Sequence, residues 1–159
     1  MTWKLNRKLN QMARDMRAKV TPLQEFIEQT VELRAQAKRN QDSELEDIAN
    51  FVQFVLLAHK DVAFLVADVY ESRDSDRKCL YLRFLALTLF EFLDDLQVLL
   101  NNKFRARVDK IFSGEHFQQE FRKICKHCNK IRESHEEMLR KVRNAVVAHR
   151  HHDGICLPG

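Results

Sequence analysis

The scarcity of glycine and proline is the feature that most constrains how this chain folds. Its 159 residues include three Gly and two Pro, whereas β-sandwiches and barrels depend on frequent turns that are rich in these residues. Eleven Phe and a hydrophobic share of 45% supply the side chains for a core, which excludes a disordered chain. The composition predicts an all-α protein, and the length fits one domain spanning residues 1–159.

Apolar residues recur at alternating steps of three and four, the spacing of near-parallel helices that pack side by side. The row in the second long helix is Ile48, Val52, Val55, His59, Val62, Val66 and Val69. The row in the last helix is Phe117, Phe121, Ile124, Cys128, Ile131, His135, Met138, Val142, Ala145 and His149. Residues 80–100 are apolar almost all round, so we expect that helix to be the most enclosed. The prediction is an antiparallel, up-down bundle of four to five helices.

Capping and turn residues mark the expected helix boundaries. We expect Thr21 and Pro22 to begin a helix, and Ser43-Glu44-Leu45-Glu46 to form a capping box that begins the next. Asp74-Ser75-Asp76 would cap a third helix. Ser113-Gly114 would precede the last helix, which His152-Asp153-Gly154 would end.

The chain lacks the features of a membrane or secreted protein. No uncharged apolar run approaches the roughly 20 residues that span a bilayer, and the first residues contain no signal-peptide stretch. We therefore expect a cytoplasmic protein with no membrane partner, whose four Cys are reduced thiols.

Charge is distributed unevenly along the chain. Residues 41–100 contain five Lys and Arg against twelve Asp and Glu, whereas residues 101–150 contain thirteen Lys and Arg against six Asp and Glu. A basic final segment beside an acidic middle suits a polyanion partner, or complementary packing between helices.

The strongest functional pattern is the run Arg143-Asn144-Ala145-Val146-Val147-Ala148-His149-Arg150 near the end of the last helix. Guanidinium groups bind phosphate oxygens bidentately, and an imidazole that titrates near neutrality can move a proton. The structural alternative is that His149 caps the helix C-terminus while Arg150 lies over apolar surface.

This run resembles the Arg–polar–His signature of the HEPN superfamily (higher eukaryotes and prokaryotes nucleotide-binding), in which an Arg precedes a His by a few residues. Its Ala-His-Arg ending is most similar to the abortive-infection and toxin–antitoxin branches. The resemblance implies a metal-independent endoribonuclease that acts as a homodimer without a cofactor, with RNA as substrate and an antitoxin protein as a further partner.

The chemistry of RNA cleavage assigns a role to each residue of the motif. RNA supplies its own nucleophile, the 2′-hydroxyl, so the protein has only to move protons and stabilise the phosphorane. We predict that His149 moves the proton, Arg143 holds the scissile phosphate and Asn144 orients one of them. Arg150 and Arg140 are further candidates for binding substrate phosphate. Glu91, Asp94 and Asp95 are weaker candidates for orienting the motif, and we expect them to be surface carboxylates.

Two other groups of residues have a more ordinary interpretation. Cys125 and Cys128 form a Cys-x-x-Cys pair, the usual first half of a zinc site, but they lie inside a long helix and we expect core thiols and no metal. We likewise expect His59 and His135 to be structural. The competing function for the whole chain is a non-catalytic helical module that binds RNA or docks a partner protein.

Overall fold

Side-chain caps set where three of the helices begin. The Asp42 carboxylate accepts a hydrogen bond from the Leu45 amide at 3.0 Å, and the Asp74 carboxylate accepts one from the Arg77 amide at 2.8 Å. The Asn101 side-chain oxygen accepts one from the Phe104 amide at 3.0 Å. Each cap satisfies an amide that has no partner within its own helix. The sequence predicted these boundaries to within one residue around positions 43 and 75, but it did not predict the start at residue 102.

The computed structural model describes residues 2–112 and 114–148, and in those ranges the regular structure is entirely helical. The helices are α1 (Thr2–Arg39), α2 (Ser43–Glu71), α3 (Ser75–Leu99), α4 (Asn102–Ile111) and α5 (Glu115–Ala148). The predicted all-α fold is confirmed, and the number of helices lies within the predicted range.

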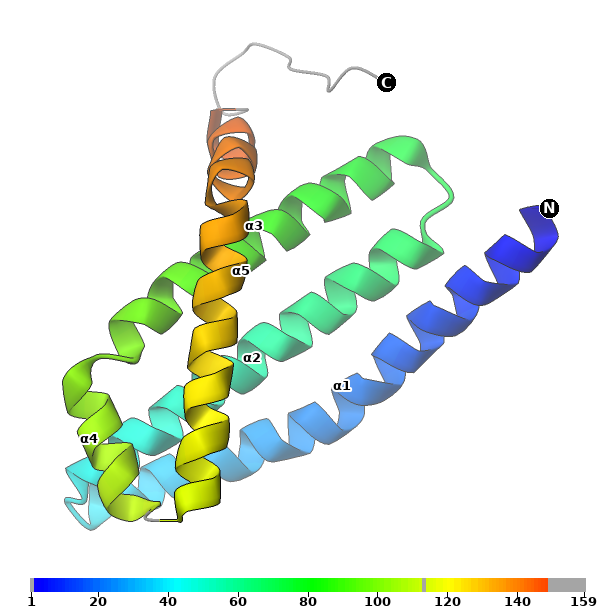
Figure 1. The fold of residues 1–159 in the computed structure, drawn as a ribbon. Helices are drawn as coiled ribbons and strands as arrows, with labels where there is room; N and C mark the ends of the chain where they lie inside the picture. Colours follow the sequence, from blue (N-terminus) through cyan, green and yellow to red (C-terminus); the bar gives the residue numbers. More distant parts are fainter. Residues whose placement is uncertain (1, 113, 149–159) are drawn as a thin grey trace.

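The first three helices lie side by side, and each runs antiparallel to the one before it (Figure 1). The short helix α4 turns the chain at the far end of α3, and α5 then crosses α3 obliquely. Helix α1 packs along α2, and α5 packs mainly on α3. The bundle is therefore open, with α1 at one side and α5 at the other.

Helix α1 differs from its predicted form because it does not break at residue 21. It continues through Pro22, which lies inside the 38-residue helix. Proline has no amide N–H and cannot donate to the carbonyl four residues earlier, here that of Ala18. Packing along α2 offsets this loss, since Leu23 and Ile27 immediately after the proline are buried.

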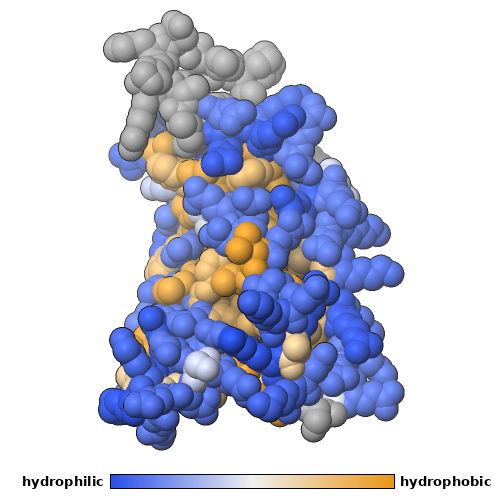
Figure 2. Space-filling view, turned by 90° about the vertical axis from the view of Figure 1, so that its left-hand side faces the viewer, coloured by the Kyte–Doolittle hydropathy of each residue, from blue (hydrophilic) through white to orange (hydrophobic). Residues whose placement is uncertain are grey.

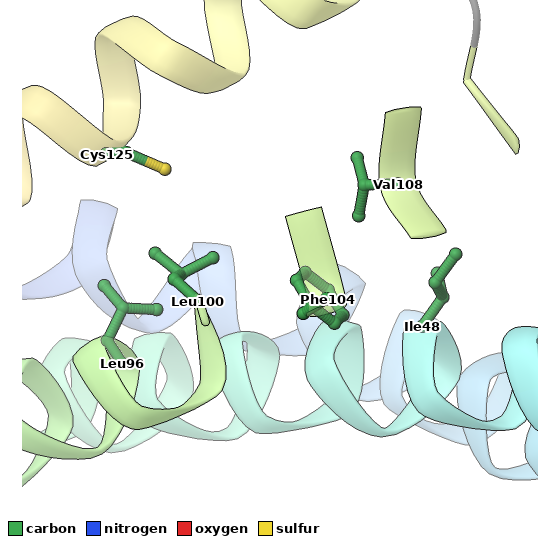
Figure 3. Close-up of a cluster of buried hydrophobic side chains, with 6 residues drawn as sticks. All are labelled: Ile48, Leu96, Leu100, Phe104, Val108 and Cys125. Carbon is green, nitrogen blue, oxygen red and sulfur yellow. The ribbon is translucent and has the colours of Figure 1, made fainter. Parts of the chain in front are cut away.

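The main core cluster lies where α3 passes into α4 (Figure 3). Four helices contribute its buried side chains, which are Ile48, Leu96, Leu100, Phe104, Val108 and Cys125. The Phe104 ring contacts Phe51, with ring centroids 4.6 Å apart. Phe54 and Phe92 stack beside the cluster at 5.4 Å. This cluster fixes α4 and the first half of α5 on the rest of the protein.

The predicted inward row of α2 is buried at Ile48 and wrong at two positions, and its other members are half-buried, namely Val55, Val62, Val66 and Val69. The fully buried residues are Ala49, Ala63 and Ala67, whereas Val52 and His59 are exposed. Alanines bring helix backbones close together, so the contact line follows the small residues and not the valines.

Helix α3 is not the most enclosed helix. Leu93 and Leu96 are buried, but Leu80 and Phe84 are exposed and Val98 is 71% exposed. The reason is the oblique crossing of α5, which covers α3 near residues 90–96 and leaves its first turns open (Figure 1). Among the described residues, no helix combines the length and the apolar character needed to cross a bilayer.

Candidate functional site

Helix α5 carries the described part of the predicted motif, residues 143–148, and presents three distinct faces. Its buried face packs on α3 and on the core cluster, through residues at steps of three, four and, once, seven. The members of this face are Phe121, Cys125, Cys128, Arg132, Leu139 and Val142. The predicted inward row shared Phe121, Cys128 and Val142 with it, but omitted Cys125 and Leu139, which are the most buried members.

The second face is a stripe of large apolar side chains at intervals of seven residues. We call Phe117, Ile124, Ile131 and Met138 the apolar stripe; their exposure ranges from 39% to 59%. All four were predicted to point inward, and that prediction is wrong. An oblique crossing lets α5 bury only one row against α3, so the neighbouring row stays open. Apolar side chains also reach the surface, between hydrophilic ones, on the side of the molecule drawn in Figure 2.

The third face is polar along its whole length. We call it the polar face; its members are Arg122, Lys126, Asn129, Glu133, Glu136, Arg140 and Arg143, and all of them are exposed. Steps of four and three keep these side chains on one side of the helix. Two of the predicted site residues, Arg140 and Arg143, thus share a face one turn apart, and exposed Asn144 lies beside them.

Arg143 has a defined contact with α3. Its guanidinium carbon lies 5.1 Å from the centroid of the Phe90 ring, within the range of a cation–π interaction. This contact holds the side chain against α3, and no hydrogen bond or ion pair within the described residues involves its N–H groups. The structure therefore brings together Arg140, Arg143 and Asn144, whereas His149 and Arg150 lie outside the described residues.

The carboxylates of α3 have separate positions. Asp94 forms an ion pair with Arg132, with Nη2 and Oδ1 3.0 Å apart, so it joins α3 to α5. Glu91 and Asp95 are exposed. All three are surface carboxylates, as expected.

A groove opens between α4 and α5 at the other end of the polar face. Its volume is about 600 Å³, and its lining residues are Arg105, Asp109, Phe121, Arg122, Cys125, Lys126, Asn129, Lys130 and Glu133. Four cations face two carboxylates there. The Arg105 Nε donates a hydrogen bond to the Leu100 carbonyl at 2.9 Å, which fixes the direction of that side chain.

The three cations that α5 contributes to this groove have no partner among the residues that the structure describes. Within residues 2–112 and 114–148, the side chains of Arg122, Lys126 and Lys130 form no hydrogen bond or ion pair. By contrast, Arg107 pairs with Asp47, and Lys110 pairs with Glu44 at 2.8 Å. The unpaired charges converge on the groove, so this region can bind an anion.

The thiols and histidines within the described ranges form no cluster that could hold a metal ion. Burial raises the pKa of the Cys125 thiol, and burial together with the neighbouring Cys125 raises that of Cys128. Both thiols are therefore protonated near neutrality. No group of three or more His, Cys, Asp or Glu in the described parts of the chain is placed to hold a metal ion. His59 and His135 are exposed, so their predicted inward position is wrong.

The groove is the feature that the sequence analysis missed. Its first wall is α4, a short helix that follows α3 after a two-residue break at Leu100 and Asn101. The sequence signal that could have indicated the groove is the polar face of α5. Its residues recur at steps of four and three, so they form one exposed side of the helix. Comparison of the chain with protein-family models, curated proteins and solved structures finds no match.

Proposed function

We propose that this chain is a metal-independent endoribonuclease of the HEPN type, acting as a homodimer in the cytoplasm as the toxin or effector of a defence or toxin–antitoxin system. The observation that supports it best is the position of Arg143. Its guanidinium is oriented by Phe90 at 5.1 Å and lies one turn from Arg140 on an exposed face. A phosphate bound there would meet two guanidinium groups.

The proposed reaction needs only proton transfer and charge stabilisation. One His149 takes the proton of the RNA 2′-hydroxyl, whose oxygen attacks the adjacent phosphorus as the bond to the 5′-oxygen breaks. The leaving 5′-oxygen receives a proton from the His149 of the second subunit. The products are a 2′,3′-cyclic phosphate end and a 5′-hydroxyl end. Arg143 stabilises the charge on the phosphorane, and Asn144 orients the phosphate or the imidazole.

The test is an RNA-cleavage assay in EDTA that compares the native chain with His149→Ala and Arg143→Gln. Acid–base assistance contributes about 10²–10⁴-fold, so we expect His149→Ala to lose detectable cleavage. His135→Ala is the matched control, because His135 is an exposed histidine on the same helix. Cleavage that persists in His149→Ala, or that requires a divalent metal, would contradict the assignment.

The apolar stripe favours a second candidate function. Four large apolar side chains at heptad intervals on an exposed face are typical of a surface that packs on another helix. In this alternative the chain is a non-catalytic module that binds a protein or RNA. A folded protein that cleaves no RNA under any condition would favour this alternative.

A further inference from the structure

We propose that the groove between α4 and α5 is a binding subsite for single-stranded RNA, distinct from the Arg143 motif. The proposal rests on the proposed function in that it takes RNA as the ligand. The groove combines four cations with an aromatic ring and with polar groups that can contact bases. Single-stranded RNA is recognised by these three kinds of group.

The cations of the groove are placed for phosphate. Arg122, Lys126 and Lys130 have no partner among the described residues, so binding phosphate breaks no ion pair within the protein. Arg105 is held by the Leu100 carbonyl through its Nε, which leaves its terminal nitrogens for a ligand. Guanidinium groups bind phosphate oxygens bidentately, and lysines add point charge.

The remaining lining residues distinguish RNA from an acidic peptide. Asp109 and Glu133 repel peptide carboxylates and RNA phosphates alike, but they can accept hydrogen bonds from the amino groups of bases, which acidic side chains lack. Asn129 can both donate to and accept from a base edge. Half-buried Phe121 lines the same groove and supplies an aromatic surface beside the cations. These features favour an unpaired nucleotide over a peptide.

The groove and the motif lie on one continuous surface of α5. Lys126 and Arg143 both belong to the polar face and are seventeen residues apart, which corresponds to roughly 26 Å along a helix. At a rise of about 3.4 Å per nucleotide, one strand needs about eight nucleotides to reach from one to the other. Glu133 and Glu136 lie between them on the polar face, so the cations form two clusters separated by an acidic section.

The experiment measures binding of fluorescein-labelled single-stranded RNA by anisotropy, in the His149→Ala background so that the RNA stays intact. The groove variant is Arg122→Gln with Lys126→Gln and Lys130→Gln. The matched control is Lys19→Gln with Arg34→Gln and Lys38→Gln, three exposed cations of α1. Circular dichroism and thermal melting check that both triple variants fold as the parent does.

We expect the groove variant to bind a twelve-nucleotide RNA at least about tenfold more weakly at 0.1 M salt, and its salt slope to fall by about 2, since each lost phosphate contact removes about 0.7. The control should change little. We also expect the parent to bind twelve nucleotides much more tightly than five, because only the longer RNA spans both clusters. The groove variant should bind the two RNA lengths with similar affinity.

The outcomes separate this proposal from the proposed function. RNA binding that depends on the groove, in a protein that never cleaves RNA, would uphold the subsite and refute the nuclease. Cleavage that needs His149, combined with equal loss of binding in the groove and control variants, would uphold the nuclease and overturn the subsite. Failure to bind RNA, or displacement of RNA by a polyglutamate peptide at equal charge concentration, would also overturn it.

Discussion

The pair α1–α2 buries alanines beside larger side chains such as Leu23 and Ile27, whereas the described part of α3, α4 and α5 buries no alanine. The fully buried residues of the pair are alanines, namely Ala13, Ala37, Ala49, Ala63 and Ala67, each at most 2% exposed. The other region buries large side chains, among them Leu93, Leu96, Phe104 and Leu139. Helix α1 packs closely on α2, but its outer side stays exposed and includes Phe26 and Val31. Helix α5 touches α3 along one row and leaves two faces open, and its polar face lines the charged groove.

The largest effect should come from removing a large side chain where four helices meet. Phe104→Ala leaves a cavity in the core cluster, because Phe104 is 7% exposed and contacts Phe51. We expect a loss of about 3–5 kcal/mol in the free energy of unfolding, measured by urea denaturation. Phe84→Ala is the control, since Phe84 is exposed and should cost under about 1 kcal/mol. Equal losses of unfolding free energy in the two variants would mean that the core cluster does not hold α4 and α5 on the rest of the protein.

A second change tests the close contact of α1 and α2 by adding a larger side chain instead of removing one. Ala63→Leu inserts a side chain at a position that is 2% exposed, and overpacking costs about 1–3 kcal/mol. The same urea experiment measures it. Ala18→Leu, at an exposed site on α1, should change stability little. If Ala63→Leu proved neutral, the helices would have to lie further apart than their buried alanines indicate.

A smaller effect should follow from the ion pairs at the far end of the α1–α2 pair. Arg17 donates to Asp68 at 2.8 Å and to Glu71 at 2.6 Å, and its hydrogen bonding to Glu71 lowers the pKa of that carboxyl. The side chains of Arg17 and Glu71 are each about two-fifths exposed. Solvent screening therefore limits the loss of unfolding free energy in Arg17→Gln to about 1 kcal/mol or less.

The pH dependence of that loss has a definite sign. A carboxyl with a lowered pKa in the folded state stabilises the fold above its unfolded pKa of about 4.3. The stability difference between the native chain and Arg17→Gln should therefore be constant from pH 6 to 8. It should shrink as the pH falls below about 4.3 toward the folded pKa. A difference that grew on acidification would contradict the assigned pairing.

The smallest effect on stability should come from modifying the exposed thiol. In a Cys156→Ser background, iodoacetamide should alkylate Cys79 first, because Cys79 is exposed. Cys125 and Cys128 should react much more slowly, since burial raises the pKa of both thiols and restricts access. Mass spectrometry against time measures the order, and alkylation of Cys79 alone should leave the unfolding curve unchanged. Early labelling of Cys125 would show that the part of the groove lined by Cys125 opens in solution.

The sequence was sufficient for the fold class but not for the register of every helix. Low glycine and proline content and the three–four spacing of apolar residues correctly predicted helices. The inward row was misplaced in α2 because the alanines that make the contact carry little hydrophobic signal. It was misplaced in α5 because the apolar stripe is more hydrophobic than the row containing Cys125 that is actually buried.

The candidate site was predictable only where it depends on one helix. The common face of Arg140 and Arg143 follows from their spacing on α5. Their contact with α3 through Phe90 does not, because it depends on the angle at which two distant segments cross. The groove was not predicted for the same reason: one of its walls is α4, whose position is set by the core cluster.

Pro22 has a consequence for how α1 exchanges its amide hydrogens. With no donor at residue 22, the hydrogen-bond ladder of the helix is interrupted between Ala18 and Pro22. The turns before this gap can open without breaking the turns after it, which are anchored by buried Leu23, Ile27 and Ala37. We therefore expect amide hydrogen exchange to report a lower opening free energy for the turns of α1 before Pro22 than for the turns after it.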